Sequence, residues 1–494
     1  MTLRIYNTLK GKKEAFIPLE EGKAGMYVCG PTVYDNCHMG HARASIVFDV
    51  VFRYLIYKGL HVTYVRNITD IDDKIIKKAN DEGVDFKVIT KRYIKSFHDD
   101  MLDLGNKPPT LEPKATGHIK EIIEIIKRLI ANGHAYQVDS DVYYSVENFG
   151  EYGKLSGRKT DELISGARID VDKRKKSPLD FALWKSSKAG EPSWDSPWGE
   201  GRPGWHIECS AMSCKHLGES FDIHGGGKDL VFSHHENEVA QSEAASGKPF
   251  AKYWLHNGFV NVNQEKMSKS LGNFFTIRDL LGLYHPEILR FFLLTTHYRS
   301  PIDYTDQSLK DAETALERIY TTLGAIDSVL AEGPHPGHGG QREGEGADAD
   351  AEDLINSLSE RFEEAMDDDF NSALAIAAIF DTVRAVNRWI KAPGFAGTKA
   401  ALSVLGKGRE SLLEAGDVLG ILKSDPAVFI KSLQESRRSD KEIDAAEVES
   451  LIAERWEARS AKDWAKSDEI RDRLSEMGVV IKDSKEGTTW ELKG

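Results

Sequence analysis

The sequence feature that most constrains the fold is a segment in which a strand pattern changes to a helix pattern. Met26 to Cys29 is typical of a buried strand that ends at Gly30-Pro31, and Ala42 to Tyr57 is typical of the helix that follows. His38-Met39-Gly40-His41 lies at the expected start of this helix. A helix N-terminus presents unpaired N–H groups and the positive end of the helix dipole, so this turn favours phosphate binding.

Strand and helix patterns alternate around this turn. A second strand is expected at His61 to Arg66, followed by a helix from about Asp72, and the alternation resumes with a helix at Trp205 to Leu217 and a strand from Phe221 that ends in three glycines. Between the two parts lie a helix, a hairpin-like strand pair and a polar, basic stretch that reaches Pro192. We therefore predict an α/β fold: a doubly wound, parallel-sheet (Rossmann-type) domain with an insertion, then a helical bundle and a small mixed α/β C-terminal domain.

The expected domain limits follow these changes of pattern. We predict the first half of the nucleotide-binding domain at 1–120, an inserted connective segment at 121–200, the second half at 201–315, a helical bundle at 316–430 and a small mixed domain at 440–494. Segment 332–350 is rich in Gly, Pro, His and acidic residues, so we expect a disordered loop there. The last domain is expected to hold one amphipathic helix with Ile452, Trp456, Trp464 and Ile470, and a strand pair.

Composition excludes several classes of protein. The net charge of −14 argues against binding along nucleic acid by bulk attraction, although local basic patches such as Lys173 to Lys176 can still contact it. No apolar run approaches the ~18 residues of a membrane span, and the first residues lack a signal segment, so we expect a cytoplasmic protein without a membrane partner. Four cysteines, at 29, 37, 209 and 214, are too few and too scattered for a disulfide framework.

Two short motifs indicate binding of a nucleoside triphosphate. His38 and His41 can donate hydrogen bonds to phosphate oxygens, and Gly40 between them leaves room for a base or a ribose. Lys266-Met267-Ser268-Lys269-Ser270 supplies two ammonium groups before a flexible break, and lysines on a mobile loop can close over a triphosphate. Taken alone, the His motif is best explained as a pair of surface histidines, and the alternative for the Lys motif is an exposed basic turn.

In this order and at this distance, the two motifs resemble the signatures of class I aminoacyl-tRNA synthetases. Four further blocks narrow the resemblance to the cysteinyl-tRNA synthetase family: Tyr27 to Asp35, Asn67 to Lys74, Gly204 to Ser210 and His224 to Leu230. The similarity covers nearly the whole chain. Its one departure is the Gly-rich, acidic segment from Glu332 to Asp350, which touches no motif.

The resemblance implies an enzyme that activates L-cysteine with ATP and Mg²⁺ and transfers it to the 3′ end of tRNA(Cys). It implies catalytic roles for His38, His41, Lys266 and Lys269. Gly40, Gly226 and Asp229 are expected to contact ATP together with these residues. The inserted segment would clamp the acceptor end of the tRNA, the bundle would bind tRNA, and the last domain would bind the anticodon. A monomer is the expected state.

The resemblance also implies one Zn²⁺ per chain, with Cys29, Cys209, His234 and Glu238 as its ligands. Without the resemblance, each cysteine is best explained as a small buried hydrophobe, and Cys37 and Cys214 keep that interpretation. Spacing does not separate His234 from His235, because they lie four and three residues from Glu238. A substrate thiolate would bind zinc directly, whereas a serine hydroxyl is a harder donor, so no editing domain is expected.

Two further residues are expected at the cysteine substrate, namely Thr69 and Trp205, with a helix-capping threonine and a core tryptophan as the alternatives. Three other functions stay open: a cysteine ligase of the same fold that acts on an amino sugar, as in the mycothiol pathway, a non-catalytic RNA-binding module, and a zinc-stabilised structural protein. The long C-terminal tail argues against the first alternative. The intact His and Lys motifs argue against the second.

Overall fold

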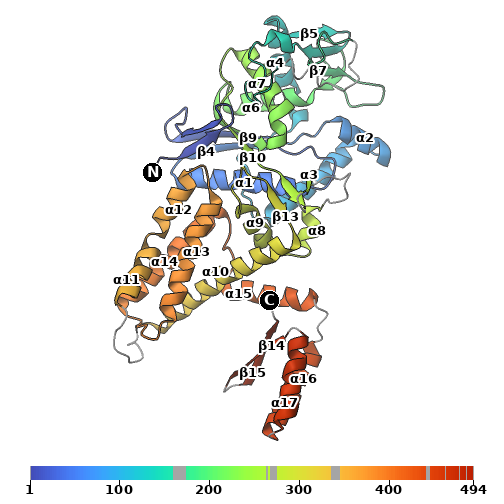
Figure 1. The fold of residues 1–494 in the computed structure, drawn as a ribbon. Helices are drawn as coiled ribbons and strands as arrows, with labels where there is room; N and C mark the ends of the chain where they lie inside the picture. The colour runs from blue at the N-terminus through green and yellow to red at the C-terminus, as the bar shows by residue number, and fades with distance from the viewer. Residues whose placement is uncertain are drawn as a thin grey trace.

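A four-stranded parallel sheet lies at the centre of the N-terminal half (Figure 1). Its strands run in the order β10-β9-β3-β4, with bounds Ala251–Asn257, Phe221–Gly227, Lys23–Val28 and His61–Arg66. The computed structural model describes residues 2–159, 174–262, 265–266, 275–334, 345–440, 445–461, 463–477, 479–484 and 487–492. A hairpin of β1 (Arg4–Asn7) and β2 (Lys12–Ala15) precedes the sheet.

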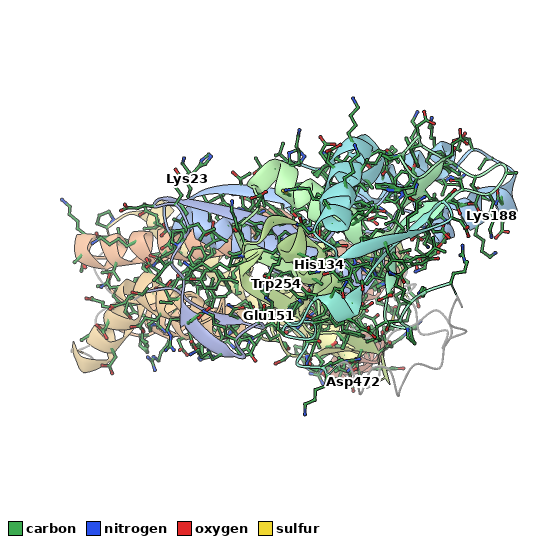
Figure 2. All side chains as sticks on the ribbon, turned by 90° about the horizontal axis from the view of Figure 1, so that it is seen from above. Lys23, His134, Glu151, Lys188, Trp254 and Asp472 are labelled. Atoms are coloured by element: carbon green, nitrogen blue, oxygen red, sulfur yellow. The ribbon has the colours of Figure 1, made fainter. Side chains whose placement is uncertain are left out.

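Helix α1 (Met39–Tyr57) packs against this sheet and is buried over most of its length. It forms because its run of Ala, Ile, Val, Phe and Leu can face both the sheet and the helical bundle, so that polar residues are few. Trp254 of β10 is buried near the middle of the view in Figure 2, whereas Lys23 at the start of β3 is exposed. Helices α2 (Asp73–Glu82) and α3 (Phe86–Asp103) follow β4.

The insertion forms a second, antiparallel sheet with its own apolar core. Its order is β5-β6-β7-β8, with bounds Ala135–Val138, Asp141–Tyr144, Phe181–Ser186 and Gly201–Pro203. Three helices pack against it, namely α4 (Ile119–Ala131), α6 (Trp205–Leu217) and α7 (Glu236–Ser246). Short 3-10 turns lie at Ala115–Gly117, Val146–Asn148 and Lys228–Leu230, and a π-helical turn lies at Val231–His235.

A small three-stranded sheet connects the parallel sheet to the helices that follow. Strand β11 (Val260–Val262) pairs in parallel with β13 (Ile302–Tyr304) and antiparallel with β12 (Glu265–Lys266). Helices α8 (Ile277–Leu281) and α9 (Pro286–Leu294) lie between β12 and β13 in the chain. The Lys266–Ser270 motif thus begins on a strand that is tied to β13, although residues 267–270 lie outside the described residues.

The C-terminal half is mainly helical (Figure 1). Its bundle consists of α10 (Asp306–Glu332), α11 (Glu345–Asn356), α12 (Leu358–Asp367), α13 (Ser372–Ile390), α14 (Lys399–Leu419) and α15 (Pro426–Asp440). The last unit contains α16 (Ala445–Ser460), α17 (Trp464–Glu476) and the antiparallel pair β14 (Val479–Ser484) and β15 (Gly487–Leu492). Among the helices of the described ranges, none combines the length and the apolar character that a membrane crossing requires.

The predicted α/β class with an insertion and helical C-terminal parts is confirmed, and three local predictions are corrected. The stretch expected to be polar and basic contains β7 (Phe181–Ser186), in which Phe181, Leu183 and Trp184 are buried in the inserted sheet. Residues 345–350 of the expected loop are helical in α11, and residues 335–344 lie outside the described residues. The expected single C-terminal helix is two, α16 and α17, and Trp456 and Trp464 are exposed.

One glycine at the end of β3 is required by packing. A Cβ at Gly30 would lie 1.7 Å from the carbonyl oxygen of Asn67, and the Gly30 N–H donates to Asn67 Oδ1 at 2.8 Å. Gly25 lies within β3 itself, but a Cβ there would have only ordinary contacts of 3.5 Å or more. Gly30 and Gly25 therefore serve as test and control for a substitution by alanine.

We predict that Gly30→Ala lowers the free energy of unfolding by roughly 1–3 kcal/mol, because the backbone of Asn67 must move. Gly25→Ala should change it by less than about 1 kcal/mol. Denaturant titration of both variants beside the unmodified chain measures the difference. Equal stability of the two variants would contradict the close approach.

Candidate active site and metal centre

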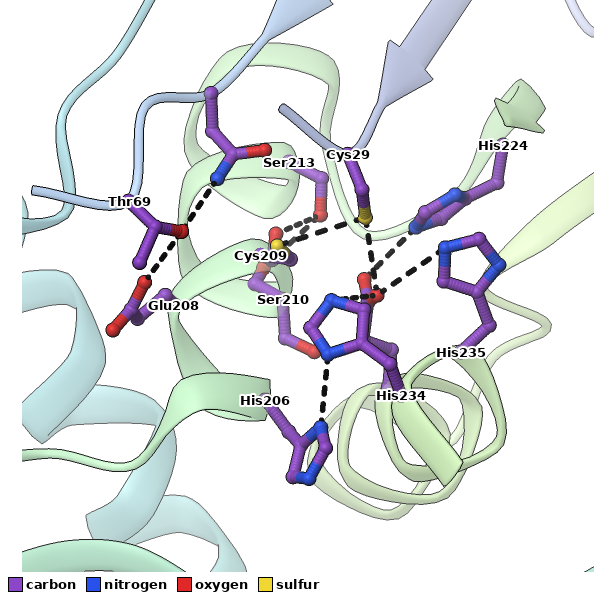
Figure 3. A network of polar contacts seen from close by, with 12 residues as sticks. Cys29, Thr69, His206, Glu208, Cys209, Ser210, Ser213, His224, His234 and His235 are labelled. Atoms are coloured by element: carbon purple, nitrogen blue, oxygen red, sulfur yellow. Dashed lines mark hydrogen bonds and ion pairs between the residues drawn. The ribbon is translucent and has the colours of Figure 1, made fainter. Parts of the chain in front are cut away.

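Several polar side chains meet at the carboxyl edge of the parallel sheet, where α/β folds commonly bind ligands. Cys29 directly follows β3, and its N–H donates to the carbonyl of Gly225 in β9 at 3.1 Å. Thr69 follows β4, and Cys209 comes from α6. His234 lies in the π-helical turn and Glu238 in the first turn of α7. Figure 3 shows these segments around one centre.

The four predicted metal ligands come together. The Sγ atoms of Cys29 and Cys209 are 3.7 Å apart, and Cys29 Sγ lies 3.5 Å from Glu238 Oε1. His234 Nε2 lies 3.0 Å from the same carboxylate oxygen. One ligand atom from each of the four lies within 4.8 Å of all the others, so this group can hold a metal ion.

A second group of four shares two members with the first. Cys29, His224, His235 and Glu238 also have ligand atoms within 4.8 Å of one another. In this group, however, His235 Nε2 is 3.9 Å from Glu238 Oε1, and its Nδ1 is 2.8 Å from His256 Nε2. We favour the first group because its members approach Glu238 Oε1 more closely.

Two further histidines orient members of the first group. His224 Nε2 lies 2.8 Å from Glu238 Oε2, the oxygen that faces away from His234. His206 Nδ1 lies 2.9 Å from His234 Nδ1 (Figure 3). Such contacts behind ligand side chains fix their orientation and commonly change metal affinity by ~10–100-fold.

Charges inside this buried group separate the pKa values of its two thiols. Burial, together with Cys209 and Glu238, raises the pKa of Cys29 well above its usual range. A hydrogen bond from the Cys29 thiol, together with His234, lowers the pKa of Cys209 to about 6, against the effect of burial. Burial alone would lower the pKa of His234, but the Glu238 carboxylate and Cys209 raise it to about 10. Cys209 is therefore the thiol that ionises first.

The two residues expected at the substrate lie beside this group. The Trp205 ring is 40 % exposed and stacks on the His234 ring with 4.2 Å between centroids, which excludes the core-tryptophan alternative. Thr69 is buried and its hydroxyl donates to Glu208 Oε2 at 3.2 Å. The side chain that caps the next helix is Asp72 and not Thr69, so the capping alternative is also wrong.

The two histidines of the first motif form the N-terminus of α1. His38 is its capping residue: the Gly40 N–H donates to His38 Nδ1 at 3.0 Å, and the His38 N–H donates to His41 Nδ1 at 3.2 Å. Because both Nδ1 atoms accept, the neutral tautomer of each ring carries its proton on Nε2. The Nε2–H groups are thus donors at the positive end of a long helix.

The second motif is brought close to the first by backbone contacts. The Ile277 N–H donates to the carbonyl of Cys37 at 2.9 Å, and His38 forms a bridge with Thr276. Lys266 lies in β12, where Asn261 of β11 is its partner. Lys269 lies outside the described residues. The segments on both sides of the Lys motif are therefore anchored near His38 or to β11.

The glycine-rich end of β9 packs against protein side chains. A Cβ at Gly225 would lie 2.2 Å from a ring atom of Phe48, and one at Gly226 would lie 2.7 Å from the His235 ring. Asp229 is exposed in the short turn that follows. Close packing thus explains Gly225 and Gly226, and contact of Gly226 and Asp229 with ATP stays a prediction.

Comparison with known families covers nearly the whole chain. Residues 15–314 match the model of the tRNA synthetases class I (C) catalytic domain, and residues 361–423 match the DALR domain. Residues 445–490 match the cysteinyl-tRNA ligase anticodon binding domain. A cysteine–tRNA ligase of Pelobacter propionicus is 58% identical over 498 residues, and one of Geobacter sulfurreducens is 57% identical over 496 residues, each match covering 100% of both chains.

The chain belongs to the cysteine–tRNA ligase family. Solved structures support the class I fold at lower identity. A Mycobacterium tuberculosis methionyl-tRNA synthetase in complex with methionyl-adenylate superposes with a TM-score of 0.60 at 17% identity, covering 83% of this chain and 94% of that chain. A putative arginyl-tRNA synthetase of Campylobacter jejuni gives 0.56 at 11% identity, covering 82% and 94%. Membership of the family confirms the resemblance seen in the sequence motifs.

Sequence reasoning missed several polar residues of the site. His206, Glu208 and His224 lie inside the blocks that carry the family resemblance, but their spacing gave them no role. Their function becomes visible only through their partners, which are His234, Thr69 and Glu238. The one signal that could reveal them is a buried histidine next to a candidate ligand. Burial, however, is not visible in the sequence.

We predict that Cys209→Ser lowers the bound metal, measured by plasma mass spectrometry of the pure protein, by at least about tenfold, because a hydroxyl is a poor substitute for a thiolate. Cys214→Ser is the matched control, since Cys214 lies on the same helix and outside both groups of potential ligands. It should keep the metal of the unmodified chain. Equal metal content in both variants would contradict a role of Cys209 as a ligand.

Proposed function

We propose that this chain activates L-cysteine with ATP and transfers the cysteinyl group to the 3′ end of tRNA(Cys). One observation carries the proposal: a buried group of thiols, imidazole and carboxylate lies at the same sheet edge as the helix terminus of His38 and His41. Membership of the cysteine–tRNA ligase family supports the same substrates, which are an amino acid, ATP and tRNA.

We propose zinc as the metal, one ion per chain, held by Cys29, Cys209, His234 and Glu238. With Zn–S bonds near ~2.3 Å and Zn–N or Zn–O bonds of ~2.0–2.1 Å, a tetrahedron has edges of about 3.8 Å between two sulfurs, about 3.5 Å between sulfur and oxygen and about 3.3 Å between nitrogen and oxygen. The corresponding distances here are 3.7, 3.5 and 3.0 Å. These side chains therefore fit a tetrahedral zinc ion with little rearrangement.

The zinc would supply the choice of substrate, because a cysteine thiolate is a soft, acidic ligand and a serine hydroxyl is a harder and less acidic one. Trp205 is placed to cover the bound side chain, since its exposed ring already lies on His234. Thr69, held by Glu208, is placed to contact the substrate backbone. An apolar pocket separates close analogues by only ~10–200-fold, so selection by a metal removes the need for an editing site.

In the first step, the cysteine carboxylate attacks the α-phosphorus of ATP in line and pyrophosphate leaves. The carboxylate is already ionised at neutral pH, so no protein base is required. His38 and His41 donate their Nε2–H groups to the phosphate oxygens as charge grows on them. Lys266 and Lys269 compensate the charge of the departing pyrophosphate, and Mg²⁺ accompanies ATP as part of the substrate.

In the second step, a terminal ribose hydroxyl of the tRNA attacks the cysteinyl carbonyl and AMP leaves. We propose that the inserted segment 121–200 clamps the acceptor end and that the helical bundle 316–430 binds the body of the tRNA. The domain 440–494 would read the anticodon, and Trp456 and Trp464 are exposed on its two helices, where bases can stack. We further propose that the chain acts as a monomer in the cytoplasm.

The main alternative is a ligase that joins activated cysteine to an amino sugar. Such an enzyme has no use for a domain that binds an anticodon. The match of residues 445–490 to an anticodon binding domain, and the full-length match to cysteine–tRNA ligases, favour tRNA as the acceptor.

The deciding experiment is aminoacylation of total tRNA with labelled cysteine or labelled serine, with and without a zinc chelator. We expect cysteine to be attached and serine not, and we expect the chelator to abolish attachment of cysteine. Attachment of both amino acids at similar rates would refute selection by a metal. Transfer of cysteine to an amino sugar in preference to tRNA would refute the proposal that tRNA is the acceptor.

A second prediction concerns the Lys motif. Lys269→Ala should slow ATP–pyrophosphate exchange by at least about 100-fold, because charge on the leaving pyrophosphate is then less stabilised in the transition state. Lys248→Ala removes an exposed lysine that pairs with Glu219 outside the site, and it should exchange at the unmodified rate. Normal exchange in the Lys269 variant would refute its role.

A further inference from the structure

A buried aspartate of the helical bundle lies against the segment that joins the two signature motifs. Asp369 follows α12, is fully buried, and adopts a left-handed backbone conformation with φ of 70°. A left-handed aspartate is uncommon and costs conformational energy, so its contacts must compensate for it. No role in the mechanism described above uses this residue.

The Asp369 carboxylate is bonded on both oxygens. Oδ1 accepts from the Tyr298 hydroxyl at 2.9 Å and from the Tyr6 N–H at 2.8 Å. Oδ2 accepts from Arg299 Nε at 2.7 Å, and His297 Nε2 lies 3.5 Å from it. The carboxylate thus binds the side chains of two consecutive residues of the segment that precedes β13 and lies close to that of His297. It also ties this segment to β1.

The same segment is held from its other side by the helix that starts at the His motif. Arg43 of α1 is fully buried, and its guanidinium donates to the carbonyl of Ser300 at 2.6 Å and to those of His297 and Tyr298 at 3.3 Å. Arg43 lies two residues after His41. The position of the N-terminal turn of α1 therefore depends directly on the position of segment 297–300.

The segment also fixes the strands that lead to the Lys motif. The Gly258 N–H donates to the carbonyl of Tyr298 at 2.8 Å, and a Cβ at Gly258 would lie 2.3 Å from the carbonyl oxygen of Ser300. Strand β13 starts at Ile302 and pairs with β11, which in turn pairs with β12 at Lys266. One short segment thus contacts the supports of both signature motifs.

We propose that Asp369 is a positioning residue for ATP: it fixes segment 297–300 and thereby the spacing between the N-terminus of α1 and the strand that carries Lys266. This inference rests on the proposed function. It makes the helical bundle part of the activation machinery, although none of its described residues belongs to the metal-binding group. Displacement of a reacting group by about 1 Å from a distant change can slow a reaction by ~100-fold, so a loss at Asp369 should be large.

The test is Asp369→Asn in the full chain, assayed by cysteine-dependent ATP–pyrophosphate exchange below the unfolding temperature. Asparagine tolerates the left-handed conformation and keeps the shape. Its amide has only one acceptor oxygen, however, so it cannot accept from Arg299 at one position and from Tyr298 and Tyr6 at the other. We expect the exchange kcat to fall by at least about tenfold, with zinc content and the KM for cysteine within about twofold of the unmodified chain. The zinc content and the KM for cysteine should be unchanged because Asp369 contacts none of the four residues proposed as zinc ligands.

The matched control is Asp368→Asn. Asp368 is the adjacent residue, is half exposed, and pairs with Lys13 on the surface. The Asp368→Asn variant should catalyse ATP–pyrophosphate exchange at a rate within about twofold of that of the unmodified chain. If Asp369→Asn does not fold, Tyr298→Phe takes its place, because it removes one donor to Oδ1 and leaves the charge.

The outcomes separate the two proposals. A folded Asp369→Asn, or failing that Tyr298→Phe, that exchanges as fast as the control overturns the positioning role while the proposed function stands. A parallel loss of zinc and of cysteine affinity also overturns it, because general structural damage then explains the result. Absence of exchange in the unmodified chain overturns the proposed function and the inference with it.

Discussion

A fully buried carboxylate, that of Glu238, is the constraint on which the rest of the site depends. Removing a carboxylate from water costs several kcal/mol unless charge and hydrogen bonds replace the lost solvent. Here His224 and His234 contact its two oxygens, and they hold the pKa of Glu238 well below its usual range against the effect of burial. With two thiols at the same place, a divalent cation bound there would stabilise the arrangement further. The paired histidines, and the metal ion that we propose, are thus what allows this fold to keep a charge in its interior.

This constraint explains why part of the site was predictable and part was not. His234 and Glu238 share one helix face, so their pairing is visible in the sequence. Cys29 and Cys209 are 180 residues apart, and only the resemblance to a family brought them together before the fold was known. His224 and His206 could not be found, because their roles depend on which nitrogen or oxygen atom of another side chain they contact.

The fold shows the same division. The parallel strands and α1 were predictable because buried elements have continuous apolar patterns. Strand β7 was not, because its short apolar run lies in a basic, polar stretch and its burial depends on β6 and β8. The glycines of β9 were correctly singled out. Their close contacts with Phe48 and His235 are a packing requirement that spacing cannot distinguish from an approach to a ligand.

Helix α1 connects the helical bundle rigidly to the nucleotide site. Its N-terminal turn carries the two histidines and its middle carries Asp49, which accepts from Arg53 of the same helix at 2.7 Å and from Arg290 of α9. Arg290 also donates to the carbonyl of Leu419 at the end of α14 at 2.7 Å. A helix of 19 residues that is buried over most of its length cannot tilt independently of its partners, because close-packed interiors transmit displacement. The arrangement of the bundle therefore sets where His38 and His41 lie, even though the bundle contributes no described residue to the group around Glu238.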